Sequence, residues 1–164
     1  MRTDGQHHQL NAVITLLISC AVSGFLTHLG HPWLALGLVL GSICGLFIDP
    51  DLDHEWVTVS EGRVSKLFGK TIGKMFRLYW APYEIMLRHR SPLSHGSFPP
   101  FGWLAMILVA TPIRIVYSFL WAIPVVYYFP TVKMFLLDLP VLLWVGLYLG
   151  WAAQDLVHWI RDFT

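Results

Sequence analysis

The residue types that bind divalent metal ions occur in four short motifs spread along the chain. Each motif contributes two candidate ligands: His7 and His8 near the start, Asp51 and Asp53 in an acidic run, His89 and His95 in a central loop, and His158 and Asp162 close to the end. Imidazole nitrogens and carboxylate oxygens suit zinc-like and manganese-like cations, and shared carboxylates can bridge two or three ions. The motifs therefore predict a metal centre, provided that the fold brings them together.

Each motif also has an ordinary structural explanation. The acidic run, Asp-Pro-Asp-Leu-Asp-His (49–54), could be a hydrated helix end, and the loop 88–96 could be a polar segment at a membrane surface. His158 and Asp162 would share a helix face, where they could simply form a hydrogen-bonded pair, with Asp155 as an alternative partner of His158. His7 and His8 are adjacent, so either could be the ligand.

The elements that must position these residues belong to one apolar domain, residues 1–164. Hydrophobic residues make up 55% of the chain and charged residues 13%, and the mean hydropathy is +0.58. A soluble domain carries about 25% charged residues. This composition excludes a disordered region, a secreted disulfide scaffold and a soluble nucleic-acid module, so no nucleic-acid partner is expected. Cys20 and Cys44 lie within apolar runs and are interpreted as buried thiols.

Four apolar runs predict an all-α, polytopic membrane bundle of about four transmembrane helices, over residues 10–29, 33–48, 101–129 and 136–159. A cleaved signal peptide is the alternative for the first run and would remove His7 and His8. Glycines at four-residue spacing in the second run favour close helix packing. The third run contains Pro112 and is predicted as one kinked helix, with a short dip followed by a span as the alternative.

Between the second and third runs, residues 61–80 predict a basic amphipathic helix. Its apolar side would lie in the lipid of the interface, with its cations against anionic phosphates. The alternative is a solvated charged face that packs on the protein itself. Seven of the eleven Lys and Arg residues fall between positions 55 and 100, so this loop should remain on the cytoplasmic side.

With four crossings, the N-terminus, the 49–100 loop and the C-terminus all face the cytoplasm, and the four motifs gather on that face. His28 and His31 fall at the opposite end of the first helix and are left out of the site. Unrelated polar helix ends would be scattered over both faces, so this convergence favours a functional site. Arg114, inside the third run, should face the bundle or meet an anionic group such as a lipid phosphate, with a backbone carbonyl as the equal alternative.

The motif order carries a family resemblance. Gly5-Gln6-His7, Pro-Asp-Leu-Asp-His (50–54), His-Arg-Ser-x-x-Ser-His-Gly (89–96) and His-x-x-x-Asp (158–162) resemble small, uncharacterised membrane metal-binding proteins of bacteria. The chain is also similar to the YdjM-type inner-membrane proteins, which are regarded as metal-dependent hydrolases. Those families resemble zinc-dependent phospholipase C and the zinc single-strand nucleases, whose trinuclear sites split phosphodiesters.

The resemblance implies metal ligation by His7 or His8, Asp51, Asp53, His89, His95, His158 and Asp162, and a location in the bacterial inner membrane or an internal membrane. This chain has fewer histidines than the soluble enzymes and lacks a second His-x-x-x-Glu pair. We therefore expect about two divalent ions, with zinc as the first choice and manganese or iron as alternatives.

Two functions follow from these expectations. In the first, water activated by the metal hydrolyses phosphoester lipids or lipid-linked phosphates at the cytoplasmic leaflet, and Arg88, Arg90 and Arg114 contact the lipid or phosphate. In the alternative, the metal only holds the helix ends together, and the protein is a non-catalytic subunit that docks with partner membrane proteins. An ion transporter is less favoured, because the polar residues do not continue through the membrane.

Overall fold

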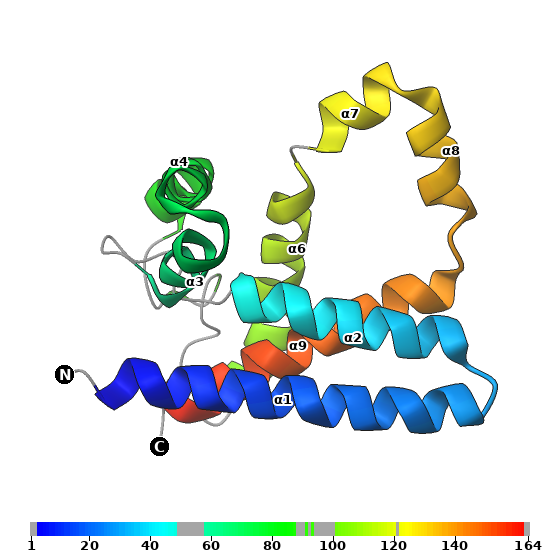
Figure 1. Ribbon diagram of the computed structural model, residues 1–164, viewed down its shortest axis with the longest axis horizontal. Coiled ribbons are helices and arrows are strands. Elements are labelled where there is room, and N and C mark those ends of the chain that lie inside the picture. Colours follow the sequence, from blue (N-terminus) through cyan, green and yellow to red (C-terminus); the bar gives the residue numbers. More distant parts are fainter. Residues whose placement is uncertain are drawn as a thin grey trace.

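The computed structural model describes residues 3–48, 58–87, 91, 93, 101–120 and 122–162, and in these ranges it contains helices and no strand. The predicted all-α class is therefore confirmed. Three long helices, α1 (Thr3–His28), α2 (Pro32–Phe47) and α9 (Val141–Asp162), lie alongside one another (Figure 1). α1 and α2 run in opposite directions and are joined by a tight turn at Gly30, whose φ is +82°.

The backbones of α2 and α9 are in direct contact, because glycines of each helix face the other. A Cβ atom added to Gly41 would lie 1.9 Å from the carbonyl oxygen of Leu147, and one added to Gly150 would lie 2.1 Å from that of Leu38. No side chain fits at these positions. The predicted close packing of the glycine-rich second run is thereby confirmed.

Polar side chains link the same three helices inside the bundle. Ser42 of α2 donates a hydrogen bond to the hydroxyl oxygen of Ser19 in α1, at 2.7 Å. Gln154 of α9 donates from its amide nitrogen to the carbonyl oxygens of Ala12, at 3.0 Å, and Ser42, at 3.2 Å. Because one of these hydrogen bonds ends on α1 and the other on α2, Gln154 fixes the level at which α1, α2 and α9 meet.

The number of helices able to cross a membrane is two or three among the described residues, and not clearly four. The windows Leu10–His28 and Gly102–Phe119 are long and apolar enough, and the bent pair of α8 (Pro130–Asp138) and α9 would add a third if it forms one span. α2 is apolar but only 16 residues long. About 20 residues are needed to cross a hydrocarbon core.

The expected single helix over 101–129 is wrong. The chain forms α5 (Gly102–Ala105), a π-helical turn, η2 (Met106–Ala110), and α6 (Thr111–Phe119), and it begins a separate helix, α7 (Ala122–Tyr128). Pro112 lacks the N–H that an α-helix would use here, and the π turn directly before it absorbs that mismatch. A helix continued beyond Phe119 would set Pro124 against the carbonyl of Leu120, which explains the break.

The last span also differs from the expectation of 136–159. α9 begins at Val141, and α8 meets it at an angle of 83°. Pro140, which precedes Val141, disfavours helical geometry at Leu139, and Leu139 has extended backbone angles. α7 and α8 together form an arch that connects α6 to the start of α9 (Figure 1).

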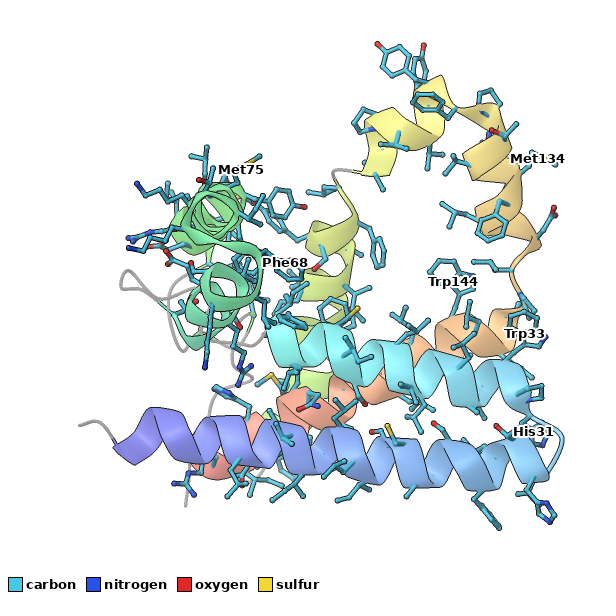
Figure 2. All side chains as sticks on the ribbon, viewed as in Figure 1. His31, Trp33, Phe68, Met75, Met134 and Trp144 are labelled. Atoms are coloured by element: carbon cyan, nitrogen blue, oxygen red, sulfur yellow. The ribbon has the colours of Figure 1, made fainter. Side chains whose placement is uncertain are left out.

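The expected helix 61–80 is divided into two, α3 (Val59–Phe68) and α4 (Lys70–Met86). The break falls at Gly69, whose φ of +91° only glycine adopts readily. The two helices pack closely, because a Cβ atom on Gly73 would lie 1.8 Å from the hydroxyl oxygen of Ser65. The amphipathic character remains, since Leu67, Phe68 and Met75 are all more than 60% exposed (Figure 2).

An aromatic cluster attaches α4 to α6. Trp80 and Tyr83 are 3% and 1% exposed, and their rings lie 5.0 and 5.2 Å from the ring of Tyr117. The hydroxyl of Tyr117 donates a hydrogen bond to the carbonyl oxygen of Tyr79, at 2.8 Å. The α3–α4 pair is thus packed on the protein at its aromatic end, while its other apolar side chains stay exposed.

Substituting Gly41 by alanine should disrupt the contact between α2 and α9. The new methyl group would overlap backbone atoms, so we expect a loss of about 1–3 kcal/mol in the free energy of unfolding, measured by denaturant titration in detergent. Gly24→Ala in α1 is the matched control, because a Cβ atom there meets nothing within 4 Å. Equal stability of the two variants would contradict the close contact.

Candidate functional site

Three helix ends meet at one end of the bundle: the beginning of α1, the end of α2 and the end of α9 (Figure 1). A small cavity of about 30 Å³ lies there, enough for one or two water molecules. Four helices contribute to its lining: α1 with Asn11 and Ala12, α2 with Gly45, α3 with Arg63, and α9 with Gln154, Val157 and His158. The cavity is therefore the point where the bundle and the α3–α4 pair join.

α1 and α9 extend well beyond the end of α2. Gln154 bonds to Ala12 and packs beside Gly45, so these three residues mark a common level. Beyond it, α2 adds only two residues, whereas α1 and α9 each add eight or nine, or about 12–13 Å of helix. The two longer helices thus continue past the end of α2, the point from which the acidic run follows in the sequence.

The structure describes only some of the predicted metal ligands, and those lie at or near this end of the bundle. His158 lines the cavity. His7 and His8 lie in the first turns of α1, and Asp162 is the last residue of α9, but only their backbones are described. Asp51, Asp53, His89 and His95 lie outside the described residues, as do Arg88 and Arg90. Within the described ranges, no three His, Cys, Asp or Glu residues form a group that could hold a metal ion.

The two excluded histidines are placed as expected. His28 ends α1, and His31 lies in the turn before α2, at the end of the bundle opposite His158 (Figure 2). The structure thus separates them from the other histidines that it describes, which lie near the beginning of α1 or near the end of α9.

Arg63 is a component of this end that the sequence did not single out. Its guanidinium donates a hydrogen bond to the carbonyl oxygen of Leu46, in the last turn of α2, and it lines the same cavity as His158. A cation at the end of a helix is favourable, because the last carbonyl groups carry partial negative charge. In the sequence Arg63 is one of the cations of the basic helix predicted over 61–80, and no spacing signal distinguishes it from Lys66 or Lys70.

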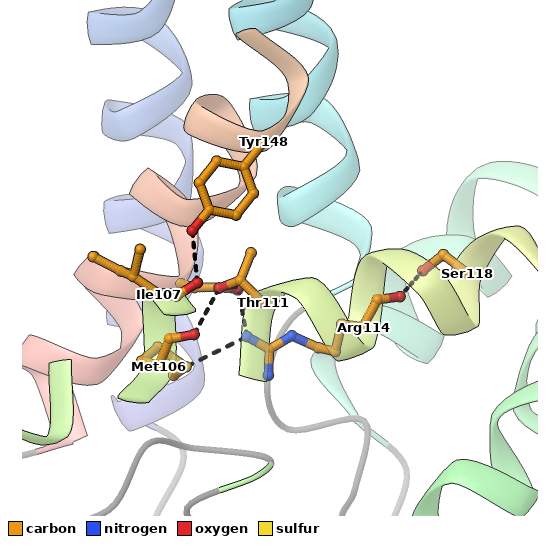
Figure 3. A network of polar contacts seen from close by, with 7 residues as sticks. Met106, Ile107, Thr111, Arg114, Ser118 and Tyr148 are labelled. Atoms are coloured by element: carbon orange, nitrogen blue, oxygen red, sulfur yellow. Dashed lines mark hydrogen bonds and ion pairs between the residues drawn. The ribbon is translucent and has the colours of Figure 1, made fainter. Parts of the chain in front are cut away.

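A wholly buried ion pair lies one helical turn before His158. Asp155 of α9 and Arg114 of α6 are both 0% exposed, and the guanidinium nitrogen lies 2.5 Å from Oδ2 of the carboxylate. The hydroxyl of Thr111 also donates to Oδ2, at 2.5 Å, and the sulfur of Met106 lies 3.4 Å from the same guanidinium nitrogen (Figure 3). The other oxygen, Oδ1, has no hydrogen-bond partner among the described residues.

The π-helical turn next to this pair is held by side chains. Thr111 lies 3.0 Å from the carbonyl oxygen of Met106, and the hydroxyl of Tyr148 donates to that of Ile107, at 2.8 Å (Figure 3). Tyr148 and Asp155 belong to α9, so α9 contacts this segment at two levels. These contacts set the rotation of α9 about its axis, and with it the direction in which His158 leaves the helix.

The partner of Arg114 is thus a carboxylate of the chain. The expectation of a lipid phosphate as one contact of Arg114 is corrected: a fully buried guanidinium that binds Asp155 does not reach a lipid headgroup. Asp155, named as an alternative partner of His158, directs Oδ2 to Arg114 and Thr111 instead. The reason is electrostatic: two charges inside an apolar bundle are tolerated only when they are paired and hydrogen-bonded.

Removing one member of this pair should destabilise the fold strongly. Asp155→Ala leaves a buried guanidinium without its carboxylate, so we expect a loss of about 3–5 kcal/mol in the free energy of unfolding. The control is Arg77→Gln, because Arg77 is 49% exposed and lies 4.0 Å from Glu61, where the loss should stay below about 1 kcal/mol. The double variant Arg114→Met, Asp155→Leu should lose less than Asp155→Ala alone, and a larger loss would refute the coupling.

Comparison with known proteins identifies the family. No curated protein and no solved structure matches the chain. Nor is there any sign of similarity to the YdjM-type hydrolases, so that resemblance stays a prediction. A family model described as an uncharacterised metal-binding protein matches residues 3–163, nearly the whole sequence. The chain therefore belongs to the DUF2227 family of metal-binding proteins.

Proposed function

We propose that the protein is embedded in a membrane and uses bound metal to hydrolyse phosphoester bonds of lipids or lipid-linked phosphates. The observation that carries this proposal is the juxtaposition of His158 and Arg63 in one cavity, where the ends of α1, α2 and α9 meet. An imidazole suits a metal ion and a guanidinium suits a phosphoryl group. The proximity of these two groups supports the proposal of a metal-dependent phosphoesterase.

Support for membrane embedding comes from the outer surface of α1. Leu17, Ile18 and Phe25 are each about 60% exposed, and they lie within the apolar window Leu10–His28. A soluble monomer seldom exposes so large a contiguous apolar surface. Lipid is the solvent in which this surface carries no cost.

The donor set fits a divalent metal. Besides His158, the proposed ligands are His7 or His8, Asp51, Asp53, His89, His95 and Asp162, a mixture of imidazoles and carboxylates that suits about two ions of zinc, manganese or iron. The overhanging ends of α1 and α9 carry three of these positions, and the acidic run follows α2 directly. A bound divalent ion supplies an activated water and neutralises charge on a phosphoryl oxygen.

The residues of the chain itself would bind and orient the substrate. Arg63 donates a hydrogen bond to the carbonyl oxygen of Leu46 at this end of the bundle and lines the same cavity as His158, so we assign it the role of contacting a phosphoryl oxygen. α3 and α4 expose apolar side chains next to lysines, an arrangement that holds a helix in the headgroup layer of an anionic membrane. Arg88 and Arg90 remain proposed headgroup contacts.

The alternative is a non-catalytic protein in which the metal only ties the helix ends together. One observation favours it: the cavity beside His158 has a volume of about 30 Å³, which holds water but no phosphate headgroup. A structural site is closed by protein ligands, whereas a catalytic one keeps a position for water. Measurements of metal content and of turnover separate the two functions.

Metal content should depend on the proposed ligands. We expect purified protein to contain about two equivalents of a transition metal by elemental mass spectrometry, and His158→Ala and Asp51→Ala each to lose at least half of it. His31→Ala is the control, because His31 lies at the opposite end of the bundle and should leave the metal content unchanged. A folded protein that contains no metal, or a metal content that neither substitution changes, would exclude the site.

Turnover should depend on Arg63. With metal bound, the wild type should release phosphate or headgroup from anionic phospholipid in mixed micelles, and Arg63→Gln should reduce kcat/KM by at least about tenfold at unchanged metal content. Lys66→Gln, one turn further along α3, is the control and should retain activity. Full metal content without release from a broad set of phosphoester lipids would instead establish the non-catalytic alternative.

A further inference from the structure

A second, larger cavity lies at the other end of α9. It has a volume of about 610 Å³, within the range of small-molecule sites. The arch of α7 and α8 borders it together with the end of α6 and the start of α9, through side chains that include Phe119, Ile123, Val126, Leu136 and Trp144. Trp144 precedes His158 by 14 residues, or about 21 Å of helix, so the cavity is separate from the candidate metal site.

Among the described lining residues, Lys133 is the one charged side chain, and the others are apolar or aromatic. Lys133 of α8 lines the cavity, its side chain is exposed, and no ion pair or side-chain hydrogen bond links it to any other described residue. Asp138 lies on the same helix without pairing to it. The cavity therefore offers a large apolar volume and one positive charge, which suits a ligand with a hydrocarbon body and an anionic group.

The arch lacks packing of its own. α7 has 7 residues and α8 has 9, and neither contains a buried residue. Helices this short are marginal in isolation and are stabilised by burial of an apolar face. The inner face of the arch borders a cavity instead of a packed core, so an apolar occupant would supply the burial that the chain does not.

Aromatic residues mark this end of the molecule as a membrane interface. Trp33 and Trp144 lie at the end of the bundle opposite His158 (Figure 2), and on the arch Tyr127 and Tyr128 are 78% and 73% exposed. Tryptophan and tyrosine gather at the boundary between lipid and water. In a membrane, these residues would place the cavity at the depth where acyl chains join their headgroups.

We propose that the arch cavity binds an acyl chain of an anionic membrane lipid, whose headgroup is held by Lys133. The proposal rests on the membrane embedding proposed above but needs neither metal nor hydrolysis, so a negative result for metal content or turnover would leave it standing. It commits to a lipid because the charge at the cavity is positive and because the apolar volume is bordered by aromatic side chains of the kind found at the membrane interface.

Quenching of Trp144 by brominated lipids tests this proposal. The full chain is reconstituted in vesicles that contain either phosphatidylglycerol or phosphatidylcholine with bromines on one acyl chain. The fluorescence of the wild type minus that of Trp144→Phe isolates the Trp144 signal. We expect half-maximal quenching of that signal at an about fivefold lower mole fraction of the anionic lipid.

The matched variants give opposite expectations. Lys133→Gln should abolish the fivefold preference, whereas Lys74→Gln on α4 should retain it. Ala122→Phe, which fills the cavity, should reduce quenching by both lipids, with helix content checked by circular dichroism. Equal quenching by the two lipids, a preference that survives Lys133→Gln, or a Trp144 shielded from both lipids by a protein segment or a second copy of the chain would overturn the proposal.

Discussion

Backbone contact between α2 and α9 is the constraint on which the rest of the structure depends. Gly41 and Gly150 leave no room for a side chain between the two helices, so the backbones of α2 and α9 lie in direct contact. α1 then packs against both, and Gln154 joins all three at one level. Every element of the candidate site is placed relative to this pair, since α9 carries His158 and α2 ends where the acidic run begins.

The buried pair of Arg114 and Asp155 extends this arrangement to the second half of the chain. Glycines fix how near α9 lies to α2, but small residues alone do not fix its rotation. The ion pair and the bond from Tyr148 attach a different face of α9 to the segment formed by η2 and α6. Because Asp155 precedes His158 by three residues, the same bonds that hold the bundle together also orient the residue at its open end.

Much of this fold could be predicted from the sequence, because apolar length and glycine spacing are local signals. They predicted the all-α class, the tight packing of 33–48 and the separation of His28 and His31 from the other histidines that the structure describes. The breaks were less accessible. Gly69, Pro124 and Pro140 each end or divide an expected helix, and whether such a residue bends a helix or stops it depends on contacts far along the chain.

The site was predicted only in part, for a related reason. Helix ends can be located from hydropathy, so the approach of α1, α2 and α9 at one end follows from the order of the apolar runs. The partners of single side chains cannot be located in this way. Nothing in the sequence indicates that Arg114 contacts Asp155, 41 residues later, or that Arg63 contacts Leu46, 17 residues earlier. For the proposed ligands whose side chains the structure does not describe, metal binding stays a prediction.

The short length of α2 would have a consequence for the membrane that we propose around the protein. At 16 residues it is about 24 Å long, less than the roughly 30 Å of a hydrocarbon core, while α1 has 26 residues. A bilayer adapts to such hydrophobic mismatch by thinning beside the shorter helix and by tilting the longer one. Under the proposed embedding, the leaflet would therefore dip at the end of α2, and the phosphates of neighbouring lipids would descend to the level of Arg63 and His158 without leaving the membrane.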